Sequence, residues 1–230
     1  MGLKEYIQNL IMIMNDEEGE ALIKTIFISL VASIITLGSF YFLKLRYIEN
    51  FGSRYGFYLL GAMIGYALII SLTRQVKSYT EFQCMSGMMI GMTIGMIAGF
   101  LPGFYIGATN GMFWGSVSGM TIGIGFGLWN GRCCGIMGAM EGIMAGFMGG
   151  LMGAMTAIMM LNDNLKTAAI IVTIISGAII MGLHYLIYKE TREAERINNN
   201  SELGTIILSV LLMAATILLM IFGPRSVLMQ

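Results

Sequence analysis

Long hydrophobic runs, separated by short polar or charged segments, make up most of this 230-residue chain. A run of about 20 apolar residues is long enough to cross the hydrocarbon core of a bilayer as a helix. Seven such runs cover about Leu22–Leu43, Tyr55–Leu72, Phe82–Phe100, Phe104–Trp129, Cys134–Leu161, Thr167–Tyr188 and Leu203–Phe222. The pattern predicts an all-α polytopic membrane protein of about seven transmembrane helices.

Polar segments and turn residues set the expected ends of these runs. The third run is expected to end at Leu101-Pro102-Gly103, because proline lacks the N–H that a continuing helix needs. Before the first run, Met1–Glu20 carries apolar residues at helical spacing and ends in an acidic cluster. This segment is expected to form an amphipathic helix at the membrane surface.

Glycine recurs at every fourth position through the middle third of the chain. Small residues let helix backbones approach closely in a membrane, where packing drives association. Residues 82–161 are therefore expected to form a tight three-helix core, with an amphipathic segment and two transmembrane helices in 1–81 and two more in 162–230. The repeat occupies positions 87, 91, 95, 99, 103, 107, 111, 115, 119, 123, 127, 131 and 135, and resumes after a shift of one at 138, 142, 146 and 150.

Methionine follows the other side of two of these helices, and the chain holds 23 methionines in all. At ~100° per residue, the methionines of 137–159 fall within a sector of about 120°, with Glu141 in the same sector and the glycines opposite. A second row lies in the third run, at Met85, Met88, Met89, Met92 and Met96. We expect both rows to face one shared interior.

Sulfur ligands of this kind point to one class of metal ion. Thioethers and thiolates are soft and select Cu(I), and positions four residues apart lie ~6 Å apart along a helix, a plausible distance for an ion to hop. A carboxylate within a span normally faces the bundle interior or water, so Glu141 would balance a cation or carry a coupling proton. The candidate metal ligands are Met88, Met92, Met96, Met137, Met140, Glu141, Met144, Met148, Met152, Cys84, Cys133 and Cys134.

Structural roles explain the same residues without a metal. Methionine is a flexible side chain that fills the gaps that glycines leave. Glu141 could serve as a near-interface acid that reaches headgroups or pairs with Arg132. His184, the one histidine, fits hydrogen bonding better than metal ligation, and Asn110 fits an interhelical hydrogen bond.

Composition and the absence of known motifs argue against several classes of function. Hydrophobic residues make up 57% of the chain and charged residues only 11%, against ~25% charged in soluble domains. The formal net charge is zero, which gives no reason to expect nucleic acid as a partner. The sequence has no HExxH, CxxC or Walker motif, so no enzymatic activity is expected.

The middle third resembles the Ctr-type copper transporters at the level of two motifs. Met88-Met92-Met96 and Met140-Met144-Met148-Met152 look like the MxxxM motif of that family, and Gly87-Gly91-Gly95 and Gly107-Gly111-Gly115 look like its GxxxG motif. The resemblance implies a methionine-bearing helix along a Cu(I) path and glycine-mediated packing between copies. That family has three spans and a methionine-rich N-terminus, whereas this chain has about seven spans and an acidic N-terminus.

Binding and translocation of Cu(I) along the methionine rows is therefore the expected function. Two alternatives are a non-transporting glycine-zipper scaffold, such as an assembly helper for a copper-containing complex, and a channel for a small uncharged solute. The expected partners are the lipid bilayer, a cytoplasmic copper chaperone or cupredoxin, and a second copy bound through glycine-rich faces.

Basic residues predict the orientation in a bacterial cytoplasmic membrane, because inner loops carry more Lys and Arg. With the N-terminus inside, the inner side has Lys4, Lys24, Arg74, Lys77, Arg132, Lys189, Arg192 and Arg196, and the outer side has Lys44, Arg46, Arg54, Lys166 and Arg225. This orientation places Cys84, Cys133, Cys134 and His184 at the cytoplasmic side. The adjacent Cys133 and Cys134 have Cα atoms ~3.8 Å apart, too close for an unstrained disulfide, so the thiols should be free.

A membrane-impermeant thiol reagent tests this orientation. We expect no labelling of intact cells and clear labelling after the membrane is permeabilised. Efficient labelling of intact cells would show that the cysteines face the outside.

Overall fold

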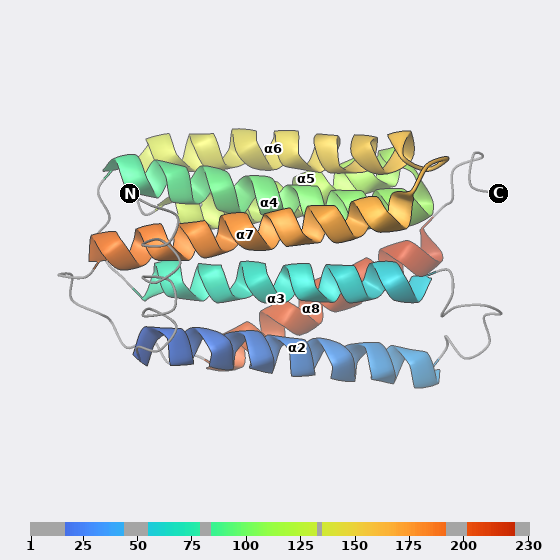
Figure 1. The fold of residues 1–230 in the computed structure, drawn as a ribbon, viewed down its shortest axis with the longest axis horizontal. Helices are drawn as coiled ribbons and strands as arrows, with labels where there is room; N and C mark the ends of the chain where they lie inside the picture. Colours follow the sequence, from blue (N-terminus) through green and yellow to red (C-terminus); the bar gives the residue numbers. More distant parts are fainter. Residues whose placement is uncertain (1–16, 44–54, 79–83, 133–134, 192–201, 224–230) are drawn as a thin grey trace.

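The computed structural model describes residues 17–43, 55–78, 84–132, 135–191 and 202–223 (Figure 1). The amphipathic segment expected at Met1–Glu20 lies outside these ranges as far as residue 16. Its last residues, from Glu17 on, belong to the first described helix. The described residues form α2 (Glu17–Leu43), α3 (Phe57–Lys77), α4 (Cys84–Asn110), α5 (Met112–Gly131), α6 (Gly135–Met159), α7 (Leu165–Thr191) and α8 (Glu202–Phe222).

Six of the seven described helices are long and apolar enough to cross a membrane. The exception is α5, whose glycines, serines and Asn130 lower its mean hydropathy. It nevertheless carries the chain back along α4 to the start of α6 (Figure 1). The all-α fold of about seven helices is confirmed, and the chain is an integral membrane protein with six candidate spans.

The boundary between the third and fourth spans differs from the one expected at Leu101-Pro102-Gly103. Helix α4 runs through Pro102 to Asn110, and the turn comes at Gly111, whose φ of 105° favours glycine. All residues from 101 to 110 are buried. Because buried backbone groups must be hydrogen-bonded, a helix that tolerates one proline is more stable there than an open turn.

Backbone contacts between α4, α5 and α6 form the most closely packed part of the molecule. A Cβ built on Gly95 would lie 2.7 Å from the Gly142 carbonyl oxygen, and one on Gly99 would lie 2.7 Å from the Gly146 carbonyl oxygen. Real Cβ atoms essentially never come this close to another atom. On α5, a Cβ on Gly119 would lie 2.7 Å from the Gly99 carbonyl oxygen. The close packing expected from the glycine repeat is confirmed.

A frame of α2, α3, α7 and α8 packs against this glycine core, with α3 in contact with each of the other three and with α4 (Figure 1). Gly61 and Gly65 of α3 lie against Tyr105 and Leu101 of α4. The Tyr105 hydroxyl lies 2.6 Å from the Thr173 hydroxyl of α7, within hydrogen-bond distance. One helix, α4, therefore joins the glycine core to the larger side chains of the frame.

Leucine substitutions at core glycines test the backbone contacts. We expect Gly91→Leu and Gly146→Leu each to lower the free energy of unfolding by about 3 kcal/mol or more, because a side chain has no room there. Gly125→Leu on α5 is the matched control, since a Cβ at Gly125 meets nothing within 4 Å. Unfolding of the purified variants in detergent measures the difference. Core variants that melt like the Gly125 variant would contradict the close packing.

Candidate functional site

Both methionine rows point away from the helix core. On α6, Met137, Met140, Met144, Met148 and Met152 are 56% to 65% exposed. On α4, Met92 is 50% and Met96 is 38% exposed, while Met88 is half-buried. The expectation of a shared interior lined by both rows is therefore wrong for the single chain. The glycine faces turn inward because only they allow the backbones to touch, so the bulky thioether side chains are left on the outside.

The rows of α4 and α6 nevertheless lie on one side of the molecule. Gly95 lies against Gly142 and Gly99 against Gly146, so the two helices run parallel at a fixed register. The backbone of Met96 lies directly against α6, since a Cβ on Gly149 would overlap the Met96 carbonyl oxygen, so the exposed row of α4 runs beside α6. We call this surface the methionine flank, formed by Met85, Met89, Met92, Met96, Met137, Met140, Met144, Met148, Met152, Met155 and Met159.

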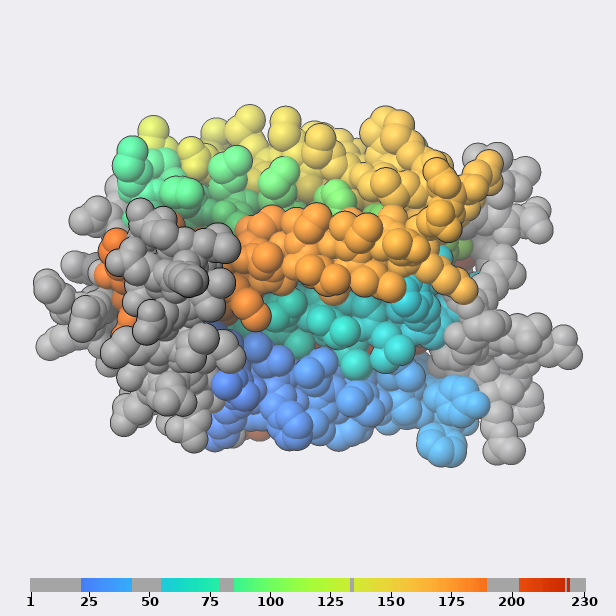
Figure 2. Space-filling view, viewed as in Figure 1, coloured from blue at the N-terminus to red at the C-terminus, as the bar shows by residue number. Residues whose placement is uncertain are grey.

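No other exposed helix face has this composition among the described residues. The exposed large apolar residues of α7 are mainly isoleucines, among them Ile170, Ile174 and Ile179. On α8 they are leucine, isoleucine and valine, such as Leu211 and Ile207. The exposed positions of α7 and α8 are thus mostly branched aliphatics, with Met181 the exposed methionine of α7. Among the described residues, rows of exposed methionines occur only on α4 and α6. In Figure 2, α6 forms an outer edge of the molecule.

Glu141 lies in the methionine sector of α6 and is half-buried. The register between Gly95 and Gly142 places Glu141 level with the stretch of α4 between Met92 and Met96. Within the described part of the chain, the structure shows no ion pair between Glu141 and Arg132. The carboxylate is therefore surrounded along and across the flank by thioether positions.

The remaining candidate ligands are the three cysteines. Cys133 and Cys134, and the side chain of Cys84, lie outside the described residues. His184 is buried on α7, and its Nδ1 contacts the side-chain oxygen of Gln75 on α3. It has the hydrogen-bonded role expected for a lone histidine. Among the described residues, no group of three or more His, Cys, Asp or Glu could hold a metal ion.

Asn110 makes the interhelical hydrogen bond expected from the sequence. It ends α4, and its side-chain nitrogen donates to the Leu219 carbonyl oxygen on α8. This bond ties the end of the glycine core to the frame.

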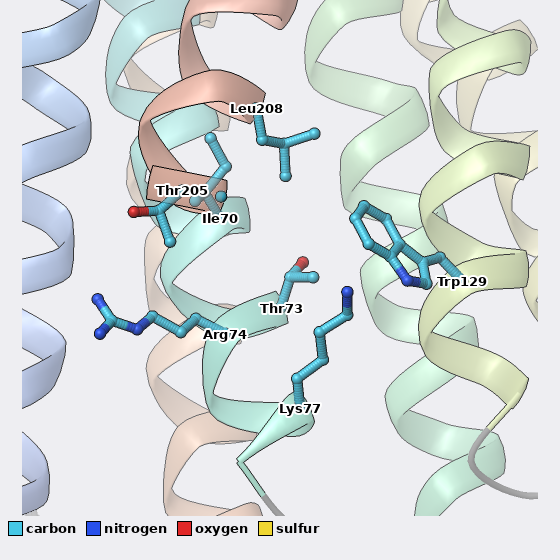
Figure 3. Close-up of a pocket in the computed structure, with 8 residues that line it drawn as sticks. Ile70, Thr73, Arg74, Lys77, Trp129, Thr205 and Leu208 are labelled. Carbon is cyan, nitrogen blue, oxygen red and sulfur yellow. The ribbon is translucent and has the colours of Figure 1, made fainter. Parts of the chain in front are cut away.

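A second polar site is one that sequence reasoning missed. Arg74 and Lys77, at the end of α3, line a pocket together with Trp129 of α5 and Thr205 of α8 (Figure 3). In the sequence, the two basic residues indicate only the end of a span. The sequence shows that Arg74 and Lys77 are about one helical turn apart, but it does not show that α5 and α8 pack beside them.

Alanine substitutions test the exposure of the flank. Met144→Ala should change the free energy of unfolding by less than about 1 kcal/mol, because Met144 is mostly exposed. Met213→Ala on α8 should cost about 2–5 kcal/mol, because Met213 is fully buried and its removal leaves a cavity. Equal losses in detergent unfolding would show that Met144 is packed inside the protein.

Comparisons with known proteins found no matching family model, no matching curated protein and no matching solved structure.

Proposed function

We propose that this protein is a non-transporting membrane scaffold that binds a soft monovalent metal ion, Cu(I) first, on its methionine flank. The observation that carries the proposal is the outward row of thioethers on two parallel helices, with one carboxylate among them. Neither lipid contact nor internal packing requires a row of methionines there, since the exposed large apolar residues of α7 are isoleucines apart from Met181.

The chemistry of the flank suits Cu(I). Neutral thioethers are soft ligands, and Cu(I) accepts them where Mg²⁺, Ca²⁺ or Mn²⁺ would take oxygen ligands. Glu141 adds a negative charge that would offset the charge of a bound monovalent cation. An ionisable side chain within a span is a candidate functional residue, and its neighbours on this flank are sulfur atoms.

Transport through the single chain is disfavoured by the packing of the glycine core. Cβ atoms on Gly95, Gly99 and Gly103 would lie within 2.8 Å of carbonyl oxygens of α6, so these helices leave no room for an ion or a solute between them. A Cu(I) path along the methionines would need a second surface to cover the flank.

The glycine faces and the methionine flank together support a scaffold role. The glycine faces are occupied within the chain, so the expected homo-oligomer through glycine-rich faces is not available to α4, α5 and α6. Methionine is soft and adaptable, and is common on surfaces that bind several partners. We propose that the flank presents Cu(I) to a copper-containing membrane complex, with a chaperone or cupredoxin as the source.

Metal titration of the full chain in lipid nanodiscs tests this function. Under reducing conditions, competition with a chromophoric Cu(I) chelator measures affinity. We expect the double variant Met92→Leu, Met144→Leu to bind Cu(I) at least about tenfold more weakly, because leucine keeps the shape and removes the ligand. Glu141→Gln should also weaken binding near neutral pH. Met112→Leu is the matched control, since Met112 is exposed on α5 outside the flank.

Two outcomes would overturn the proposal. Equal affinity of the double variant and the Met112 control would show that the flank binds no metal. Cu(I) uptake by proteoliposomes that carry the protein, lost in the double variant, would show a transporter instead of a scaffold.

A further inference from the structure

One pocket among the described residues combines positive charge with a hollow between helices. It lies between α3, α5 and α8 and has a volume of about 170 Å³ (Figure 3). Its lining consists of Ile70, Thr73, Arg74, Lys77, Trp129, Gly204, Thr205 and Leu208. Two of these residues are basic and none is acidic, so the lining carries a net positive charge.

The ammonium group of Lys77 lies over the ring of Trp129 (Figure 3). Its Nζ atom is 3.4 Å from the ring centroid, which is the geometry of a cation–π contact. The ring covers one side of the ammonium group and leaves other N–H donors for a ligand. The Lys77 charge therefore has a fixed place beside the cavity.

Arg74 forms the second charged part of the lining. Its Nη1 atom donates to the Thr25 hydroxyl of α2 at 2.8 Å, so the guanidinium is directed toward α2 (Figure 3). A guanidinium has five N–H donors, and this bond uses one. Thr73 also lines the pocket, and its hydroxyl donates to the Ile69 carbonyl oxygen at 2.9 Å. The same hydroxyl accepts a long hydrogen bond of 3.5 Å from the Asn130 side-chain nitrogen.

The beginning of α8 adds further donors. Gly204 and Thr205 lie in the first turn of this helix, which starts at Glu202. The first N–H groups of a helix have no partner within it, and the helix dipole makes this end partly positive. Lys77, Arg74 and a helix N-terminus therefore all line one cavity, although the Arg74 guanidinium is directed toward α2. This combination favours an anion such as a phosphate.

The position of the pocket gives an anionic lipid access to it. The last turn of α3 and the first turn of α8 lie at one end of the bundle, where a span meets the headgroup region (Figure 1). Basic pockets between transmembrane helices at this depth are suited to anionic lipid headgroups. Ile70 and Leu208 provide an apolar part of the lining against which an acyl chain could pack.

We propose that this pocket is a binding site for a phosphate group, supplied by an anionic phospholipid headgroup or by free phosphate. Lys77 and the N–H groups at the start of α8 bind the phosphate oxygens, and Arg74, one turn before Lys77 on α3, adds positive charge to the lining. The site is separate from the methionine flank and does not depend on metal binding.

The fluorescence of Trp129 provides a direct readout. The chain has two tryptophans, and Trp114→Phe on α5 leaves Trp129 as the sole tryptophan emitter. The full chain with this substitution is titrated in a non-ionic detergent with short-chain phosphatidylglycerol, short-chain phosphatidylcholine or inorganic phosphate, each at constant ionic strength. Phosphatidylcholine carries the same phosphate with a compensating cation, so it should bind more weakly.

We expect a saturable change in emission with phosphatidylglycerol. Lys77→Gln should raise the apparent dissociation constant at least about tenfold, because a charge-assisted hydrogen bond is lost. Arg74→Gln should raise it by a smaller factor. The matched control is Lys189→Gln, which removes an exposed charge at the end of α7, outside the pocket lining. A response to phosphatidylglycerol alone identifies a lipid site, and a response to inorganic phosphate as well identifies the phosphate as sufficient.

Three results would overturn the proposal. The first is no saturable response to either anionic probe. The second is equal binding of phosphatidylglycerol and phosphatidylcholine with no effect of Lys77→Gln. The third is an equal loss in Lys77→Gln and Lys189→Gln, which would show a general effect of surface charge.

Discussion

Direct contact between the backbones of α4, α5 and α6 is the constraint on which the rest of the structure depends. In a bilayer, helices gain little from burying apolar side chains away from lipid, so close packing has to hold them together. Glycine at every fourth position gives these three helices continuous faces without side chains. The resulting contacts are especially close between α5 and α6, where a Cβ on Gly127 would overlap the Gly142 carbonyl oxygen.

The same constraint decides where the methionines lie. A helix whose glycine face is committed to its neighbours must place its large side chains elsewhere, and on α6 they lie on the opposite side. The packing of the glycine core thus explains why large side chains lie on this flank, but it does not explain why they are methionines. Residues exposed on α7 show that isoleucine suffices where a helix faces outward, so the choice of sulfur calls for a reason beyond packing.

Polar side chains mark the joints between the glycine core and the frame. Tyr105 with Thr173 and Asn110 with Leu219 each connect α4 to a helix of the frame. Within the frame, the His184 side chain contacts Gln75 and so connects α7 to α3. The basic pocket lined by Arg74 and Lys77 lies at another such joint, where α3 and α8 meet α5 at the end of the bundle. Function in this protein is therefore proposed at two separate surfaces, one apolar and rich in sulfur and one basic.

The sequence by itself determined the class of fold and most helix positions, because long apolar runs have one stable form in a bilayer. It also determined the close packing of 84–159, since the glycine period is a property of the chain alone. Sequence alone misplaced one turn: Pro102 looks like a helix end, yet the burial of residues 101–110 keeps the helix intact as far as Gly111. Only the tertiary structure decided which face of α4 and α6 is inside, because a helix with glycine on one side and methionine on the other can bury either. It also brought Lys77 beside Trp129, two residues far apart in the chain whose contact depends on how α3 packs near α5.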